Sequence, residues 1–315
     1  MNRHRIRRVA GGLALVAVLA SVVVAESADA AAKPTASAQI DILTFNVLGP
    51  LWASPTWYPE IDEPALLDTE YRRERLTSYL QSVRSTAELV CLQEVAASEL
   101  PYLAAALGPG FTGAMSFNDP SYWSNWIVPP IEWEPNGTAV FARRDAFSDI
   151  TVADRALGTG NHAAELTATH KASGRPVHVW SVHLDSDREK NRAREIDAVL
   201  AATPASASTI DVICGDINED TQTGTVAGIT KRAGFTDVLA AVGVRTATHP
   251  WSTSYNKSKR WAIIDHVMVR GATPSAGLVE DAGVASIADE SERIEEYLRR
   301  MGSDHYAVLA TVTTG

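Results

Sequence analysis

The sequence predicts a layered α/β domain, because strands and helices follow one another along both halves of the chain. Apolar runs rich in β-branched residues and bounded by turn residues predict strands. Periodicity along the chain does not define the order of these strands in a sheet, but their interspersion with helices favours a layered α/β or α+β architecture. The expected strands cover residues 39–46, 88–94, 137–143, 163–170, 176–183, 209–216, 262–270 and 305–313.

Four segments between these strands have the spacing of amphipathic helices. The first, 68–84, carries Leu76 and Leu80 on one apolar stripe. The second, 187–202, opens on an aspartate that is suited to cap a helix. The third and fourth, 223–233 and 288–301, are each followed by a glycine, which readily adopts the left-handed conformation that ends a helix.

The first 30 residues have the three parts of a secretory signal. Four arginines between positions 3 and 8 precede an apolar run over 9–25, and Ala28-Asp29-Ala30 supplies small residues for cleavage. An uncleaved membrane anchor is the alternative, although the apolar run is at the short limit for a span. We expect cleavage near Ala30, a disordered tail over 31–38, one domain over 39–315 and a secreted protein.

The charge of the chain excludes one common mode of nucleic-acid binding. Removing the first 30 residues takes away four arginines and two acidic residues, so the net charge changes from −10 to −12. A protein this acidic does not bind nucleic acid through a broad basic field. A metal-dependent nuclease stays possible, because a divalent ion supplies local positive charge.

The two cysteines are expected to be reduced. Cys91 lies three residues before Glu94, and Cys214 lies two residues before Asp216. If both acidic residues face one site, alternation along the strands places the two sulfur atoms on opposite faces. The sequence therefore favours two small buried hydrophobes over a disulfide.

Two long stretches without regular structure are expected at 49–63 and 111–135. They hold five of the eight tryptophans. Stretches of this length inside a domain are usually functional or disordered, and the aromatic content argues against disorder. Three interpretations stay open: a lid packed on the rim of the fold, a platform that stacks a base, sugar or apolar tail, and a surface that docks on a membrane.

Polar residues follow several of the expected strands at the point where each strand ends. Alternation along an extended chain puts the side chains of Asp216 and Asn218 on the same face. Gly215 leaves room for a second backbone or a ligand to come close. Such polar ends are suited to hold a phosphate, a metal ion or a water molecule. The same arrangement recurs at Asn46, Glu94, His183, Asp265 and the pair Asp304–His305.

Seven short motifs occur in the order TFNV, LQEV, NGTAVF, SVHLD, GDIN, IDHV and SDHY. In order, spacing and residue type they resemble the endonuclease/exonuclease/phosphatase superfamily, which has the deoxyribonuclease I-like fold. The match runs from about Ile40 to the C-terminus and does not define a subfamily. The resemblance implies a four-layer α/β sandwich, with two mixed β-sheets face to face and helices outside.

The resemblance also implies roles for individual residues. Oxygen ligands suit Mg²⁺, with Mn²⁺ as a substitute, and the spacing brings no cysteine and histidine set together for zinc. Histidine with an orienting carboxylate is suited to exchange protons near neutral pH. The implied roles are metal binding by Asn46 and Glu94, a second metal-side carboxylate at Asp304, phosphate contact by His183, orientation of water and phosphate by Asp216 and Asn218, and acid–base work by Asp265 and His305.

Other polar residues receive simpler interpretations. Asp185 is expected to cap the helix that follows it. Arg72 and the two arginines near it lie on a predicted helix and are expected to be solvated. His249 lies in a loop, and His266 has the opposite parity to Asp265 and should face away from the site.

One part of the expected phosphate-binding machinery is unassigned. Many relatives have a tyrosine or arginine between the metal-binding glutamate and the first histidine, but Tyr122, Asn136 and Arg143 match no such motif here. The basic cluster at 257–260 either touches a substrate phosphate or is an ordinary exposed loop.

The sequence therefore indicates a metal-dependent phosphoesterase in which water attacks a phosphodiester. We expect a nuclease, with a sphingomyelinase-like phospholipid phosphodiesterase or a phosphomonoesterase as alternatives, acting as a monomer without an obligate protein partner. A catalytically silent binding module is the alternative of a different class. Such a module should lack at least one of Glu94, Asp216, Asn218 or His305, and all four are present.

Overall fold

The computed structural model describes residues 38–59, 61–119, 134–219, 224–249 and 263–315. They belong to one compact unit. The helices in these ranges are too short or too polar to span a lipid bilayer. The expected signal peptide and its cleavage site, Tyr122, three of the loop tryptophans and the basic cluster at 257–260 lie outside the described residues.

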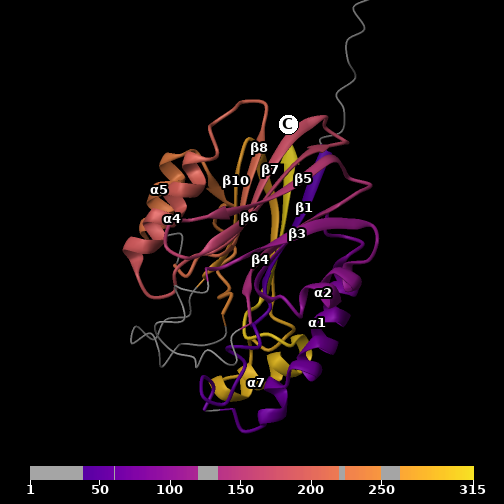
Figure 1. Ribbon diagram of the computed structural model, residues 1–315, viewed down its shortest axis with the longest axis vertical. Coiled ribbons are helices and arrows are strands. Elements are labelled where there is room, and N and C mark those ends of the chain that lie inside the picture. The colour runs from indigo at the N-terminus through magenta and orange to yellow at the C-terminus, as the bar shows by residue number, and fades with distance from the viewer. Residues whose placement is uncertain (1–37, 60, 120–133, 220–223, 250–262) are drawn as a thin grey trace, which may run out of the picture. The chain divides into compact units, whose positions relative to one another are not determined.

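Two six-stranded sheets form the body of the fold (Figure 1). Each sheet is mixed, because β1 runs parallel to β2 and β7 runs parallel to β8, while the other neighbours are antiparallel. In the first sheet the order is β11 (Thr273–Glu280), β12 (Ala307–Thr314), β1 (Ala38–Asn46), β2 (Leu89–Ala96), β4 (Asn136–Arg143) and β3 (Phe111–Phe117). In the second it is β5 (Phe147–Ala156), β6 (His162–His170), β7 (Arg175–His183), β8 (Ile210–Asp216), β10 (Asp265–Arg270) and β9 (Thr236–Asp237).

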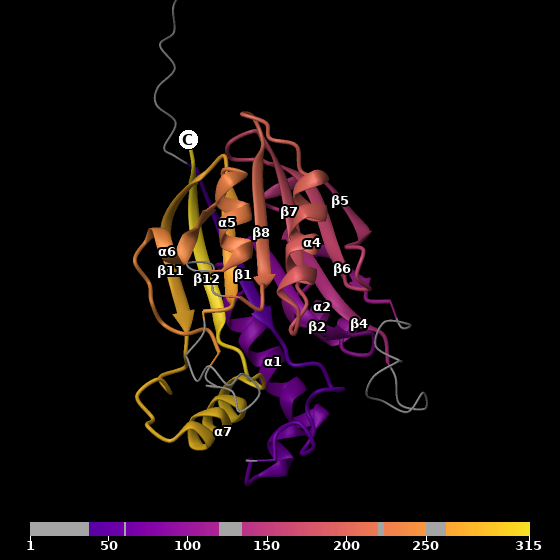
Figure 2. The ribbon, with the colours of Figure 1, turned by 90° about the vertical axis from the view of Figure 1, so that its left-hand side faces the viewer.

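Helices cover the outer faces of both sheets. Figure 2 shows α4 (Glu189–Ala201) and α5 (Thr225–Arg232) in front of the second sheet, where Trp180 packs with apolar residues of both helices. On the other side α1 (Thr69–Val83) and α2 (Leu100–Leu107) cover the first sheet. This arrangement confirms the expected four-layer α/β sandwich. The remaining helical segments are η1 (Pro64–Leu67), α6 (Val238–Ala241) and α7 (Glu290–Met301).

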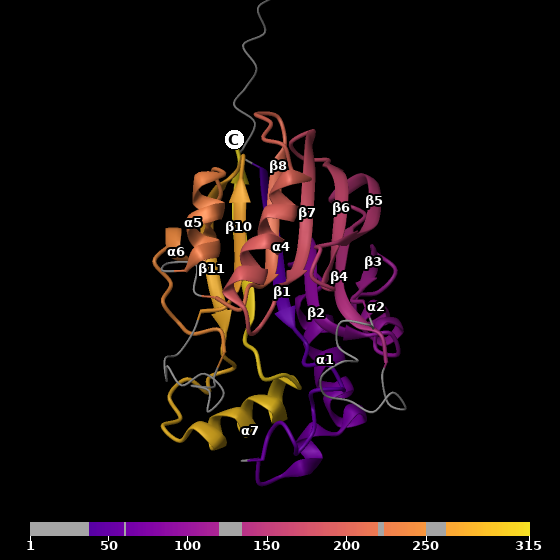
Figure 3. The ribbon, with the colours of Figure 1, turned by 60° about the vertical axis from the view of Figure 1, so that its left-hand side comes forward.

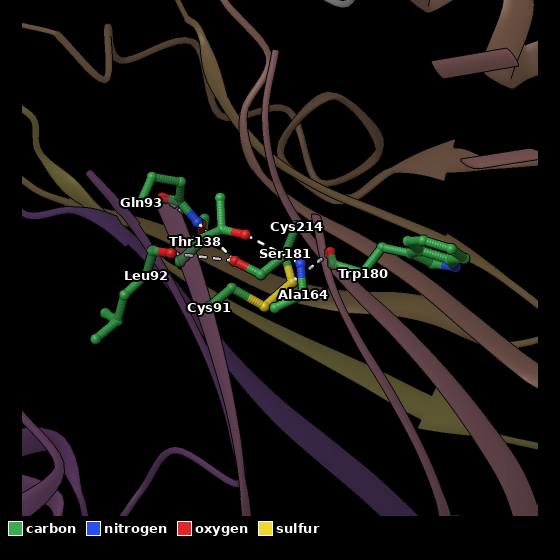
Figure 4. Close-up of a disulfide and its surroundings, with 9 residues drawn as sticks. Cys91, Leu92, Gln93, Thr138, Ala164, Trp180, Ser181 and Cys214 are labelled. Carbon is green, nitrogen blue, oxygen red and sulfur yellow. Dashed lines mark hydrogen bonds between the residues drawn. A yellow bond between two sulfur atoms is a disulfide. The ribbon is translucent and has the colours of Figure 1, made fainter. Parts of the chain in front are cut away.

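The main core fills the space between the sheets. It contains side chains such as Val140 of β4 and Val212 of β8, which are fully buried. A short polar strip crosses this core near the site end of the strands. Gln93 donates from Nε2 to Ser181 Oγ at 3.3 Å, and Ser181 donates to Leu92 O at 3.2 Å (Figure 4). The two sheets are therefore joined by hydrogen bonds as well as by apolar contact.

A disulfide joins the two sheets, so the expectation of two reduced cysteines was wrong. Cys91 of β2 and Cys214 of β8 are bonded, with their Cα atoms 6.2 Å apart (Figure 4). The parity argument failed because a β-bulge interrupts β2 between Leu92 and Val95. Glu94 lies in that bulge with φ of 57°, so the regular alternation does not extend from Cys91 to Glu94.

The sequence analysis did not predict the four edge strands, but it predicted every central strand. The edge strands are β3, β5, β9 and β11. The stretch 111–135 was expected to be irregular, but its first residues form the edge strand β3. An edge strand exposes more of its residues, so its apolar pattern is weaker. In β5 only Phe147 is buried, and β11 has a proline at its second position, next to a bulge.

Candidate active site

The eight expected site residues lie at one end of the sandwich and come from both sheets. Strands β1, β2, β7 and β8 end there, while β10 and β12 begin there, at the lower end in Figure 3. The register pairs Asp216 with His183 on one side and with Asp265 on the other. The polar residues at the strand ends therefore meet in one place, although they are far apart in the sequence.

Asn46 connects the residues of the two sheets. Its Nδ2 donates to Glu94 Oε1 at 3.1 Å and to Asp216 Oδ2 at 3.2 Å, and lies 3.4 Å from His305 Nε2. Its Oδ1 accepts from the backbone N–H of Leu48 at 3.0 Å. The buried amide thus presents nitrogen to the carboxylates, and its oxygen would reach a cation only after the amide had turned over.

His305 and Asp265 form a buried pair. His305 Nδ1 lies 2.9 Å from Asp265 Oδ2, and its Nε2 faces Asp216 Oδ2 at 3.7 Å. Burial alone would lower the pKa of His305, but the carboxylates of Asp265 and Asp304 raise it well above its ordinary value. The imidazole is therefore oriented by a carboxylate and keeps Nε2 directed toward the other site residues.

Glu94 is held by backbone geometry as well as by hydrogen bonds. Gly49 N–H donates to its Oε2 at 2.9 Å. A Cβ atom on Gly49 would lie 2.8 Å from the carbonyl oxygen of Glu94, so only glycine permits this approach. Burial raises the pKa of Glu94 against the opposing effect of His183, and Asp304 raises it further. A cation beside Glu94 would stabilise its ionised carboxylate against burial and the repulsion from Asp304.

Asp304 has two partners that the sequence analysis did not identify. Tyr58 donates its hydroxyl to Asp304 Oδ2 at 2.7 Å, and His249 Nε2 lies 3.4 Å from the same atom. Burial alone would raise the pKa of Asp304, but the imidazoles of His305 and His249 lower it well below its usual value. The carboxylate is therefore ionised, and its buried Oδ1 has no hydrogen-bond partner among the described residues.

His183, Asp216 and Asn218 lie together at the ends of β7 and β8. His183 Nε2 is 3.5 Å from Asp216 Oδ2, and the backbone N–H of Asn218 donates to Asp216 Oδ1 at 2.8 Å. Asn218 has φ of 53° and donates its amide to Leu184 O at 2.9 Å. Gly215 is required here, since a Cβ atom on it would lie 1.9 Å from Val182 O. The strands approach closely, as the glycine predicted.

The residues present fit a divalent cation. Glu94, Asp216 and Asp304 supply carboxylate oxygens, which are hard ligands. Asp304 Oδ1, which is buried and unpartnered within the part of the chain that the structure describes, is available to a metal ion. Within the described residues, two groups bring three possible ligand atoms within 4.8 Å of one another. They are His249 with Asp304 and His305, and Asp216 with Asp265 and His305.

One of the simpler interpretations is confirmed and two were wrong. Asp185 does not cap α4, whose N-cap is Arg188 without a side-chain cap hydrogen bond. Its Oδ1 instead accepts from the N–H groups of Asp187 and Arg188 in the turn before the helix. His266 faces away from the site toward Asp237. Arg72 is not solvated: it is 2% exposed and donates to the carbonyl oxygens of residues 47, 48 and 302. Arg72 therefore connects the segment that follows β1 to the turn that precedes Asp304.

The structure does not identify the missing tyrosine or arginine that would bind phosphate. Arg143 pairs with Glu88 at 2.9 Å, and β2 begins one residue after Glu88, at the end opposite to the site. Asn136 lies at the start of β4 and accepts a hydrogen bond from Asn118. Neither side chain contacts the residues described above through a hydrogen bond or ion pair among the described residues.

Solved structures of other proteins share the fold of this chain, and a family model matches its sequence. The endonuclease/exonuclease/phosphatase from Bacteroides vulgatus is 17% identical, with a TM-score of 0.61 over 88% of this chain and 100% of that one. A functionally unknown conserved protein from Enterococcus faecalis gives a TM-score of 0.62 at 16% identity, over 88% and 100%. D. rerio TDP2 complexed with single-strand DNA product gives 0.59 at 17%, over 87% and 99%.

No curated protein sequence matches the chain. The sequence pattern of the Endonuclease/Exonuclease/phosphatase family matches residues 43–305. The chain belongs to this family and is an enzyme of the metal-dependent phosphoric ester hydrolase class. The matched range contains all eight residues that converge at the end of the sandwich.

Proposed function

We propose that this chain is an exported nuclease that hydrolyses phosphodiesters with Mg²⁺ by direct attack of water. One observation carries the proposal. The Asp265–His305 pair, with Nδ1 and Oδ2 2.9 Å apart, directs His305 Nε2 toward Asp216 of the second sheet and Asn46 of the first. A proton-exchanging group thus lies among carboxylates that suit a cation.

The proposed roles divide the work of hydrolysis among these residues. Asp216, held by the N–H of Asn218, orients and deprotonates the attacking water. His183 contacts the phosphate, and His305, oriented by Asp265, exchanges a proton with the reacting oxygens. Glu94 and Asp304, with Asn46 after rotation of its amide, hold the metal ion. When bound, Mg²⁺ neutralises charge on the phosphate oxygens.

Nucleic acid is the substrate that we favour. A relative of the same fold, D. rerio TDP2, has been solved with single-strand DNA product. The phospholipid alternative depended partly on exposed tryptophans, but Trp52 and Trp57 contact each other edge to face and pack against the apolar cluster around Leu66 and Leu298. This loop is a packed rim, so one argument for membrane docking is weaker.

Two features support export. The first 30 residues have the pattern of a cleavable signal. The second feature is the Cys91–Cys214 disulfide, because disulfides persist in oxidising compartments and are rare in the cytosol. We propose that the mature chain begins near residue 31 and acts as a monomer.

A substrate comparison tests this function. Purified protein is incubated with Mg²⁺, Mn²⁺, Ca²⁺ or EDTA and with single-strand DNA, plasmid DNA, sphingomyelin vesicles or p-nitrophenyl phosphate. We expect cleavage of DNA with Mg²⁺ or Mn²⁺ and none with EDTA. Faster release of phosphocholine from the vesicles would replace the nuclease proposal with the sphingomyelinase-like phosphodiesterase, and preference for the monoester would replace both with the phosphomonoesterase.

A further inference from the structure

We propose that His249, Asp304 and His305 form a second metal site, selective for a transition-metal dication such as Zn²⁺, whose occupation inhibits hydrolysis. The binding part of this proposal depends only on the geometry of the three side chains. The inhibitory part rests on the proposed role of His305. His249 has no role in the hydrolysis described above.

The ligand atoms already have suitable spacing. One nitrogen of each imidazole and one oxygen of Asp304 lie within 4.8 Å of one another, and all three residues are buried. His249 Nε2 is 3.4 Å from Asp304 Oδ2, and the two imidazole rings meet edge to face with centroids 4.5 Å apart. Tetrahedral zinc with bonds of about 2.1 Å separates its ligands by about 3.4 Å, so small shifts suffice.

The surrounding residues orient these ligands as the partners of metal ligands do. Asp265 binds Nδ1 of His305 at 2.9 Å, which leaves Nε2 as the atom directed into the site. Tyr58 donates to Asp304 Oδ2 at 2.7 Å, while Asp304 Oδ1 is buried and accepts no hydrogen bond from any described residue. Carboxylate–histidine and hydroxyl–carboxylate contacts of this kind fix ligand orientation and raise metal affinity.

The backbone next to His249 is also fixed. Thr248 O accepts from the N–H of Tyr306 at 2.6 Å, and Thr248 Oγ1 accepts from the N–H of Asp265 at 3.0 Å. Thr248, which precedes His249, is thereby hydrogen-bonded to Tyr306, which follows His305, and to Asp265, which orients His305. The position of His249 beside the pair is therefore built into the fold.

Ligand chemistry separates this site from the Mg²⁺ position. Two imidazole nitrogens and one carboxylate oxygen suit Zn²⁺, Co²⁺ or Mn²⁺, whereas Mg²⁺ prefers oxygen and keeps its water ligands. In the proposed mechanism Mg²⁺ is held by oxygens of Glu94, Asn46 and Asp304, so Asp304 is the one residue common to the two sites. The two cations therefore share Asp304 but take their other ligands from different residues.

Occupation of the second site should stop the reaction. The lone pair on His305 Nε2 cannot bind a metal ion and exchange a proton at the same time. Zinc bound there therefore removes the proton-exchanging group, whether or not Mg²⁺ keeps its other ligands. Because His249 and His305 bind Zn²⁺ and not Mg²⁺ in this account, raising the Mg²⁺ concentration should not fully reverse the inhibition.

The test compares His249→Phe with a matched control. The full chain, saturated with Mg²⁺, is titrated with ZnCl₂ by calorimetry and with CoCl₂ by visible absorption. His162→Phe is the control, because His162 Nδ1 also faces a carboxylate, that of Asp154 at 2.8 Å, outside the site. We expect His249→Phe to weaken Zn²⁺ and Co²⁺ binding at least 30-fold. The zinc concentration that halves activity should rise by the same factor, when the activity of each variant is expressed relative to its own rate without zinc. His162→Phe should keep wild-type zinc affinity.

A measurement on the wild-type protein covers the case in which His249→Phe does not fold. Imidazole nitrogen NMR signals of His249 and His305 should shift on addition of one equivalent of Zn²⁺, while those of His162 stay unchanged. Unchanged His249 signals, or wild-type zinc affinity in folded His249→Phe, would overturn the inference. If zinc binds as expected but His305→Ala keeps full Mg²⁺-dependent activity, the second site stands and the proposed role of His305 fails.

Discussion

Removal of the Cys91–Cys214 cross-link should cost a large share of the stability of the fold. The bond joins residues separated by 123 positions. In the loop-entropy description, closing a loop of this length stabilises the native state by about 5 kcal/mol. For a chain of this size each kcal/mol corresponds to about 2 °C, so Cys91→Ala/Cys214→Ala should lower Tm by about 10 °C.

A second variant separates the cross-link from packing. Val212 lies two residues before Cys214 on the same strand, is fully buried and belongs to the same core. Val212→Ala removes apolar contact without touching the disulfide and should cost on the order of 2 kcal/mol. Urea unfolding followed by circular dichroism measures both variants against the wild type.

The cross-link should also matter for the site. It joins the two strands that carry Glu94 and Asp216, three and two residues further on. We expect weaker Mg²⁺ binding in the double variant than in Val212→Ala. A double variant within 1 kcal/mol of wild-type stability would refute the entropic reasoning, and unchanged Mg²⁺ affinity would refute the positioning role.

Three further predictions concern single residues. His305→Ala should lower kcat by about 10²–10⁴-fold while the circular dichroism spectrum stays native; retained turnover would remove its role. Arg72→Ala should cost about 2–4 kcal/mol in urea unfolding, because three carbonyl oxygens lose their charged donor. Burial alone lowers the pKa of His266, but Asp237 raises it above the ordinary value, so the folded protein holds this proton more tightly. Stability from this pair is complete below about pH 6.5 and is lost as the pH rises through the raised pKa, a decline that should be flatter in His266→Gln.

The central strands and most site positions could be predicted from the same pattern, an apolar run that ends in a polar residue. A strand buried on both faces, such as β8, reads as an apolar run, and the polar residue that follows is conspicuous against it. Asp216 at the end of that run is an example. Parallel strand ends and antiparallel strand starts then meet at one edge, as the register of Asp216 with Asp265 shows.

Local patterns missed what depends on tertiary contact. Tyr58 and His249 lie outside the helices and strands, and only the folded chain brings both to Asp304. Arg72 has the sequence context of a solvated helix residue, yet its guanidinium is buried against backbone carbonyls from two other segments. The disulfide was missed because the bulge at Glu94 breaks the alternation on which the parity argument depended.

Hydrolysis of bis-p-nitrophenyl phosphate by EDTA-stripped protein, followed as Mg²⁺ is added, tests most directly whether these residues form one metal-dependent site. We predict no turnover before Mg²⁺ is present, a saturable rise afterwards, and a kcat at least about 10²-fold lower in Asp216→Asn. An equal rate in EDTA, or wild-type turnover in Asp216→Asn, would contradict the account.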